Sequence, residues 1–126
     1  MKITSFNPLI VTKDAAPVIR LFEELGFERR HSISANESDG AEITNVRMKN
    51  ANGFYVDVAQ APDLPQELSL IRMNVDDFDE AWKFLTDRGF HPVKGNDETL
   101  DTKTNKSVMM VSPSGYAFDL CQHIKD

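Results

Sequence analysis

Two aspartates stand at equivalent places in two similar stretches of the sequence, and they are the first candidates for chemistry. Residues 52–60 read NGFYVDVAQ and residues 114–122 read SGYAFDLCQ, so a glycine, an aromatic residue, an aspartate and a glutamine recur at one spacing. The repeated acids are Asp57 and Asp119. Paired carboxylates can ligate a hard cation, bind a ligand, or serve only the structure. The two stretches leave all three roles open.

Arg72 is informative because it interrupts an otherwise apolar predicted strand, LSLIRMNV, at residues 68–75. A guanidinium at an inward position is costly unless it is paired. Asp119 or Asp57 would supply a counter-ion and form a buried ion pair with it. Alternatively, Arg72 would bind an anionic group of a ligand, or its strand would end in solvent.

The histidines and the single cysteine do not indicate a catalytic site. His31 lies in a charged stretch, His91 precedes a proline at a turn, and His123 is near the C-terminus, so each is read as a surface or turn residue. Cys121 shares a predicted strand face with Asp119, but no histidine spacing indicates an activated thiolate. The sequence contains no nucleophile elbow, P-loop or dinucleotide fingerprint. We therefore predict no catalytic residue.

An internal repeat defines the elements that must position these side chains. Asp14 and Asp77 each precede a helical pattern that ends at Gly-Phe, and they are 63 residues apart (77 − 14). Asp57 and Asp119 are 62 residues apart (119 − 57), so one deleted loop residue explains the difference. A strand is predicted before each helix and three short strands after it. The order βαβββ therefore occurs twice.

The two modules are expected to form one domain over residues 1–126. Module 1 covers about 1–60, a proline-containing linker covers 61–66, and module 2 covers about 67–126. One helix covers only one face of a four-stranded sheet, and each module alone is marginal in size. The modules should therefore join edge to edge into one curved, eight-stranded mixed sheet of the α+β class, with the uncovered faces enclosing a cleft.

Strand alternation predicts which side chains face this cleft. Along each strand, successive residues point to opposite faces, and the apolar residues that face the helix fix the phase. The residues that we expect to line the cleft and bind a ligand are Asn7, Leu9, Tyr55, Asp57, Leu70, Arg72 and Asp119.

The paired modules carry a family resemblance. The stretches LFEELGFERR, VDDFDEAWKFLTDRGF and VSPSGYAFDL resemble the vicinal oxygen chelate superfamily, the group of glyoxalases, bleomycin resistance proteins and extradiol dioxygenases. The resemblance covers nearly the whole chain. It implies a curved eight-stranded sheet around a cleft, which is often completed by formation of a homodimer. It also implies, in most members, a divalent metal with ligands from equivalent positions of both halves.

The metal-ligand positions implied by the resemblance fall on Asn7, Asp57, Leu70 and Asp119. Leucine cannot ligate a metal, and an asparagine carbonyl is a weak ligand for a transition metal. Imidazoles, which zinc, nickel and iron favour, are missing from all four positions. Two acids and one amide would suit only Mg²⁺ or Ca²⁺, which take oxygen ligands. We therefore predict no bound metal and no cofactor, and an ion pair of Arg72 with Asp119 or Asp57 would be a structural substitute for the metal.

Three functions are compatible with this pattern. The favoured one is a metal-free protein that binds a small organic molecule by sequestration, as bleomycin resistance proteins do. If Arg72 neutralises one of the two acids, the other should favour a cationic or hydrogen-bond-donating ligand. The alternatives are a lyase, isomerase or dioxygenase that uses a metal or a carboxylate base, and a non-catalytic sensor or interaction module.

Composition narrows the class of partner. The net charge is −6 and no cluster of basic residues is present, which excludes a typical nucleic-acid-binding protein. Apolar runs are too short to cross a membrane, and the N-terminal stretch does not have the pattern of a secretory signal. A lone cysteine agrees with a reducing compartment. We expect a cytoplasmic protein with a small-molecule ligand and no membrane partner.

Overall fold

The computed structural model describes residues 1–36, 42–63, 65–93, 100–101 and 105–123. The first βαβββ module consists of β1 (Ile3–Thr12), α1 (Ala15–Glu24), β2 (Glu28–Asn36), β3 (Glu42–Lys49) and β4 (Tyr55–Gln60). The second consists of β5 (Leu68–Val75), α2 (Phe78–Thr86), β6 (His91–Pro92), β8 (Asn105–Val111) and β9 (Ala117–His123). A short additional strand, β7 (Leu100–Asp101), precedes β8. The predicted order of elements is confirmed.

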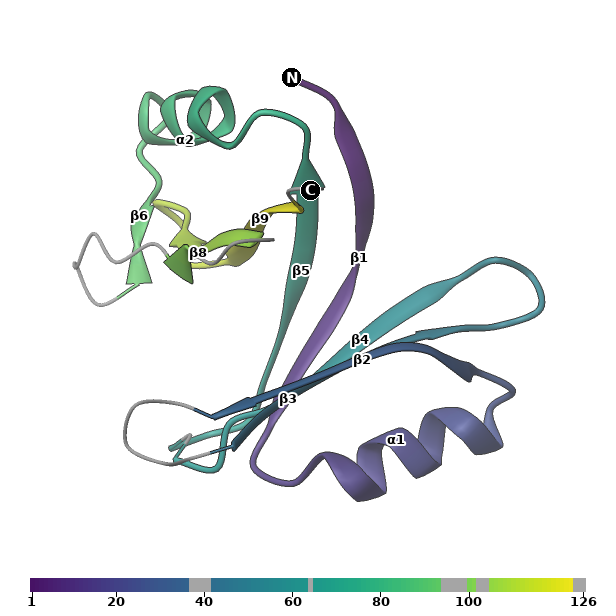
Figure 1. The fold of residues 1–126 in the computed structure, drawn as a ribbon. Coiled ribbons are helices and arrows are strands. Elements are labelled where there is room, and N and C mark those ends of the chain that lie inside the picture. The colour runs from purple at the N-terminus through teal and green to yellow at the C-terminus, as the bar shows by residue number, and fades with distance from the viewer. Residues whose placement is uncertain (37–41, 64, 94–99, 102–104, 124–126) are drawn as a thin grey trace. The chain divides into compact units, whose positions relative to one another are not determined.

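The strands form one mixed sheet in the order β2-β3-β4-β1-β5-β9-β8-β6 (Figure 1). The pairs β1–β4 and β5–β9 are parallel, whereas β2–β3, β3–β4 and β8–β9 are antiparallel. The predicted α+β class with an eight-stranded mixed sheet is therefore confirmed. Strand β7 pairs with β8 outside this order. The sequence analysis did not predict this strand, because a two-residue strand has no periodicity to detect.

The chain divides into two compact units whose boundaries differ from those of the predicted modules. The N-terminal unit is Asn7–Ser69, and the C-terminal unit combines Met1–Phe6 with Leu70–Asp126. Strand β1 therefore contributes to both units. Its later half pairs with β4, whereas in its first half Ser5 Oγ accepts a hydrogen bond of 2.8 Å from Asn74 Nδ2 of β5.

The glutamines of the two repeated stretches, which lie on β4 and β9, cap the N-termini of the two helices. The backbone N–H of Ala15 donates to Gln60 Oε1 at 2.8 Å, and that of Phe78 donates to Gln122 Oε1 at 2.7 Å. Each glutamine thus satisfies one of the N–H groups that a helix leaves without an intrahelical acceptor. The Gln of each repeated stretch is therefore a helix-capping residue.

The repeated Gly-Phe pairs end the helices. In α1, the N–H of Gly26 donates to Glu23 O at 3.0 Å and that of Phe27 to Phe22 O at 2.9 Å, the pattern of a Schellman motif. The rings of Phe22 and Phe27 are in edge-to-face contact at 5.5 Å, which is the apolar contact that accompanies this motif. Gly89 and Phe90 make the corresponding bonds at the end of α2.

Each helix covers one face of its half of the sheet. Figure 1 shows α1 lying along β2, β3 and β4. The alternation predicted for the strands is confirmed, because each unit has one apolar core between helix and strands. The buried core residues are Ala15, Ile19, Val46, Met48, Val56 and Val58 in the N-terminal unit, and Met73, Val75, Phe78, Ala81, Leu85, Val108, Met110 and Leu120 in the C-terminal unit.

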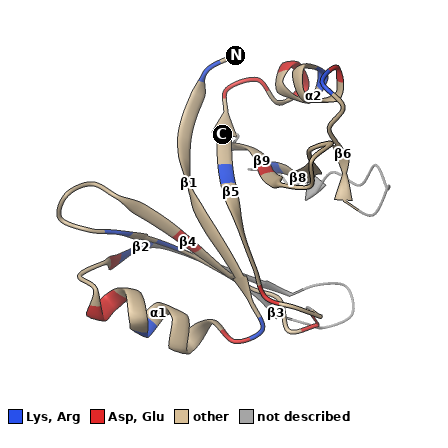
Figure 2. Cartoon of the chain, turned by 180° about the vertical axis from the view of Figure 1, so that it is seen from behind, with Lys and Arg blue, Asp and Glu red and all other residues tan. Residues whose placement is uncertain are grey.

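None of the helices in the described ranges is long and apolar enough to cross a membrane. The acidic residues that surround the start of α2 are exposed, and they appear as a red segment between β5 and α2 in Figure 2. Acidic side chains at a helix N-terminus are stabilised by the helix dipole. The position of these acidic residues at the start of α2 therefore explains them without a bound cation.

Candidate functional site

In the N-terminal unit, the candidate site is built on the hairpin of β3 and β4. The antiparallel register places Arg47 opposite Asp57 and Lys49 opposite Tyr55. Arg47 Nε donates to Asp57 Oδ1 at 2.9 Å, and Arg47 Nη2 donates to Asp57 Oδ2 at 2.9 Å. Asp57 is only 1% exposed, and the Arg47 side chain is 28% exposed. The repeated carboxylate is thus one partner of a bidentate, largely buried ion pair.

The same guanidinium also contacts the second candidate residue of this unit. Arg47 Nη2 donates to Asn7 Oδ1 at 3.3 Å, and Asn7 Nδ2 donates to the carbonyl oxygen of Pro8 at 2.9 Å. Asn7 and Asp57 are the two positions of this half that the resemblance assigns to metal ligation. Here their side-chain oxygens accept hydrogen bonds from one arginine.

The C-terminal unit contains an ion pair of the same kind. Parallel pairing of β5 with β9 aligns Arg72 with Asp119, and Arg72 Nε donates to Asp119 Oδ2 at 2.8 Å. Asp119 is buried and Arg72 is partly buried. The predicted ion pair is therefore confirmed, and its acid is Asp119.

One expectation about the charges was wrong. The sequence predicted that only Arg72 would neutralise the two acids and that one carboxylate would remain for a ligand. Asp57 instead has its own cation, Arg47. The sequence could have indicated this ion pair, because a hairpin turn at residues 50–53 brings residue 47 opposite residue 57.

The other predicted ligand-binding residues differ in accessibility. Leu9 and Leu70 are buried, so little of either side chain is open to a ligand in this structure. Tyr55 is 37% exposed. Arg47 Cζ and Lys49 Nζ each lie 5.3 Å from the centroid of the Tyr55 ring, within the range of cation–π contacts. Among the predicted residues of the N-terminal unit, Tyr55 is thus the accessible one.

The residues at the implied metal positions do not fit a metal. Within the N-terminal unit a guanidinium already satisfies both carboxylate oxygens of Asp57 and the amide oxygen of Asn7. In the C-terminal unit, Leu70 has no ligating atom and Asp119 accepts from Arg72. Over the described residues, no group of three or more His, Cys, Asp or Glu side chains could hold a metal ion. In each unit an arginine thus supplies the positive charge beside the repeated aspartate.

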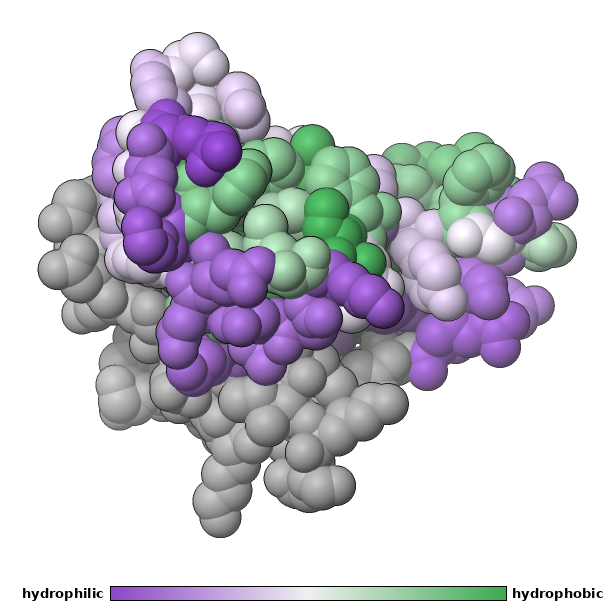
Figure 3. Space-filling model, turned by 90° about the horizontal axis from the view of Figure 1, so that it is seen from above, coloured by the Kyte–Doolittle hydropathy of each residue, from purple (hydrophilic) through white to green (hydrophobic). Residues whose placement is uncertain are grey.

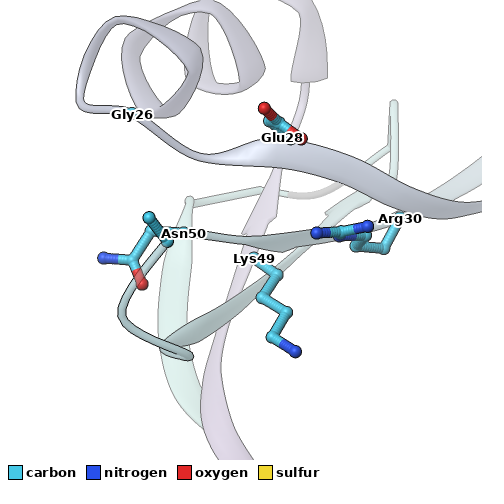
Figure 4. Close-up of a pocket in the computed structure, with 6 residues that line it drawn as sticks. Gly26, Glu28, Arg30, Lys49 and Asn50 are labelled. Atoms are coloured by element: carbon cyan, nitrogen blue, oxygen red, sulfur yellow. The ribbon is translucent and has the colours of Figure 1, made fainter.

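A small polar pocket lies beside this hairpin in the N-terminal unit, where the end of α1 meets β2 and the turn after β3 (Figure 4). Its volume is about 200 Å³. The lining includes one acidic and two basic side chains together with backbone and amide groups; the residues are Gly26, Glu28, Arg30, Lys49, Asn50 and Ala51. None of the residues predicted to bind a ligand lines this pocket. Lys49 belongs both to its wall and to the surroundings of Tyr55.

No family model matches the sequence, and no curated protein matches it. Solved structures, by contrast, match over nearly the whole chain. Methylmalonyl-CoA epimerase from Mycobacterium tuberculosis has a TM-score of 0.70 at 13% identity, with 98% of this chain and 90% of that chain covered. A glyoxalase/bleomycin resistance protein/dioxygenase superfamily member from Vibrio splendidus 12B01 has a TM-score of 0.60 at 19% identity, with 96% and 99% covered.

Glyoxalase I from Zea mays matches with a TM-score of 0.66 at 14% identity, and here 98% of this chain covers 44% of that chain. These likenesses, together with the two βαβββ modules, identify the fold. The chain has the vicinal oxygen chelate fold, in its glyoxalase and bleomycin-resistance-like form. At such low identities the likeness concerns the fold, and the activities of these proteins do not transfer with it.

Proposed function

We propose that this protein binds a small organic molecule on the sheet face opposite its helices and does so without a divalent metal, in a sequestration or resistance role. One observation carries the proposal. The side-chain oxygens of Asn7 and Asp57 are engaged by the Arg47 guanidinium, in a fold whose members usually place a metal there. The arginine supplies the positive charge from within the chain.

The same contacts argue against the enzymatic alternative. A carboxylate that works as a general base must accept a proton from a substrate. Both oxygens of Asp57 already accept hydrogen bonds from Arg47, and Asp119 Oδ2 accepts one from Arg72. Protonation of either acid would remove the negative charge that its arginine pairs with, so each ion pair disfavours that step. The geometry therefore favours binding over a lyase, isomerase or dioxygenase activity.

The test of this proposal combines metal content with ligand binding. We expect elemental analysis of untagged protein to find far less than one zinc, nickel, iron or manganese per chain. We expect a fragment screen by NMR to find small organic molecules that shift the backbone amides of β3 and β4, with affinities unchanged by a chelator. A stoichiometric metal at Asn7 and Asp57, or a screen without any binder, would contradict the proposal.

We also propose a homodimer, formed through apolar surface of the C-terminal unit. Phe6 and Tyr116 are each 56% exposed. Both contact Phe118, with ring centroids at 6.4 Å and 5.8 Å respectively, and Phe90 contacts Tyr116 at 5.8 Å. Figure 3 shows exposed hydrophobic surface in green in the view from above. A second copy is the preferred occupant, because one apolar patch can cover its equivalent around a two-fold axis.

Light scattering of the purified protein should give the mass of two chains of 14.2 kDa each. The double variant Phe6→Ser/Tyr116→Ser should shift this equilibrium toward the monomer, since it removes apolar area from the proposed contact. Leu25→Ser is the matched control, because Leu25 is also exposed but belongs to the N-terminal unit. A wild-type mass of one chain would disprove the dimer, and an equal effect of both variants would disprove this interface.

A further inference from the structure

The two copies of the repeat agree at the positions that serve the fold. At an offset of 62 residues, the same structural roles recur in β4 and β9 and in the turns before them. Phe54 N–H donates to Asn50 Oδ1 at 2.9 Å, and Tyr116 N–H donates to Ser112 Oγ at 3.1 Å. The pairs with matching roles are Asn50 and Ser112, Gly53 and Gly115, Asp57 and Asp119, and Gln60 and Gln122.

The copies differ at three neighbouring positions on the face opposite the helix. In the N-terminal unit these positions carry two cationic side chains and an aromatic one, whereas the C-terminal unit has apolar residues there. At the same offset the pairs are Arg47 and Met109, Lys49 and Val111, and Tyr55 and Ala117. In the C-terminal unit the aspartate pairs with Arg72 instead, and the same hairpin forms without the counterparts of Lys49 and Tyr55, so the hairpin does not require these two side chains.

The three residues form one cluster, which we call the Tyr55 cluster: Arg47, Lys49 and Tyr55. Both cations lie 5.3 Å from the Tyr55 ring centroid. The ring is 37% exposed and Lys49 is partly exposed. Arg47 is held in place by Asp57, so its side chain loses little further freedom when a ligand binds.

The charged side chains that the structure describes in this cluster, its ion pair and the adjoining pocket sum to a positive value, although the whole chain is acidic. Among the described side chains of the cluster, its ion pair and the adjoining pocket, three are positive and two are negative, a net charge of +1 (3 − 2). These are Arg30, Arg47, Lys49, Glu28 and Asp57. The net charge of the whole chain is −6. A local positive region on an acidic protein attracts a small anion and repels a small cation.

We propose that the Tyr55 cluster binds a small organic carboxylate with a flat apolar body. The inference rests on the proposed binding function and names its ligand class. Lys49 would donate a charge-assisted hydrogen bond to the carboxylate, and the Arg47 guanidinium would add positive charge beside it. The exposed face of Tyr55 would contact the apolar body. This ligand has the opposite charge to the one expected from the sequence, because Asp57 is already neutralised.

Three probes with one ring and different charges test this assignment: benzoate, benzamide and benzylamine. Each is titrated into uniformly labelled full-length protein while backbone amide shifts are followed by NMR. We expect benzoate to bind at least about tenfold more tightly than the other two, as one charge-assisted hydrogen bond implies. The largest shifts should occur in β3 and β4. Binding should weaken as salt is raised, since the lysine is partly exposed.

Lys49→Gln should weaken benzoate binding about tenfold. Tyr55→Ala, which introduces the residue of the other copy, should also weaken it. Lys13→Gln is the matched control, because it removes the same charge from an exposed site of the same unit and should leave binding unchanged. Circular dichroism verifies that each variant is folded.

The outcomes separate this inference from the proposed function. If benzamide or benzylamine binds at β3 and β4 as tightly as benzoate, or if Lys49→Gln binds benzoate like the wild type, the carboxylate assignment is wrong while small-molecule binding stands. If benzoate binds elsewhere on the chain, the assignment to the Tyr55 cluster is wrong. If neither these probes nor a wider fragment library binds, the proposed function fails as well.

Discussion

Asp57→Asn should destabilise the protein by about 3 kcal/mol, because it removes one partner of a buried ion pair and leaves the other. Asparagine has nearly the shape of aspartate, so the loss reports charge and hydrogen bonding rather than a cavity. Arg47 would face a neutral amide in place of two charged acceptors. Urea unfolding followed by circular dichroism measures the change.

An exposed ion pair supplies the control for this substitution. Lys83 of α2 and Asp87, the C-cap residue of that helix, form an i,i+4 pair with an N–O distance of 2.9 Å, and both side chains are exposed. Asp87→Asn should cost less than about 0.5 kcal/mol, since solvent screens such pairs. Equal costs for Asp57→Asn and Asp87→Asn would show that Asp57 is not a structural counter-ion.

A double-mutant cycle then assigns the loss to the contact with Arg47. Arg47→Met introduces the residue that the other copy of the repeat has at this position. Alone it should be costly, because it leaves the Asp57 carboxylate buried without its bidentate partner. Combined with Asp57→Asn, it should cost clearly less than the sum of the two single changes. Additive costs would mean that the pair is not coupled.

Gly89→Ala should destabilise the protein by about 2–4 kcal/mol, the sum of backbone strain and overpacking. Gly89 has a φ of +91°, a conformation that L-residues rarely adopt. A Cβ added to it would lie 2.8 Å from Cγ of Pro113, which is well inside van der Waals contact. The proline ring is stiff, so relief requires the turn at residues 113–115 to move. Urea unfolding again provides the measurement.

Gly26→Ala is the matched comparison, because Gly26 ends α1 as Gly89 ends α2. Its φ is +100°, but a Cβ there would meet nothing within 4 Å. This variant should therefore show the backbone strain alone, about 1–2 kcal/mol. If both variants lose the same stability, the contact between Gly89 and Pro113 does not restrict this position.

Local features of the sequence determined the architecture. Helix ends were predicted because capping by Asp14 and Asp77 and the left-handed glycines depend on neighbouring residues only. The period of two in YVDVAQ assigned Val56 and Val58 to the helix face and Asp57 to the opposite face, as observed. The repeat predicted the order of helices and strands along the chain, which is βαβββ twice.

The tertiary structure decided the chemistry of the site. The role of Asp57 depends on Arg47, which is ten residues away and comes opposite it only through the register of β3 and β4. A shift of that register by one residue would turn the arginine to the other face. The sign of the charge around Tyr55 follows from the same register, because it also places Lys49 beside the ring. The charge at a site is the sum over side chains that only folding brings together. Helix caps, turns and strand faces depend on residues that are consecutive in the sequence, so the sequence alone can predict them.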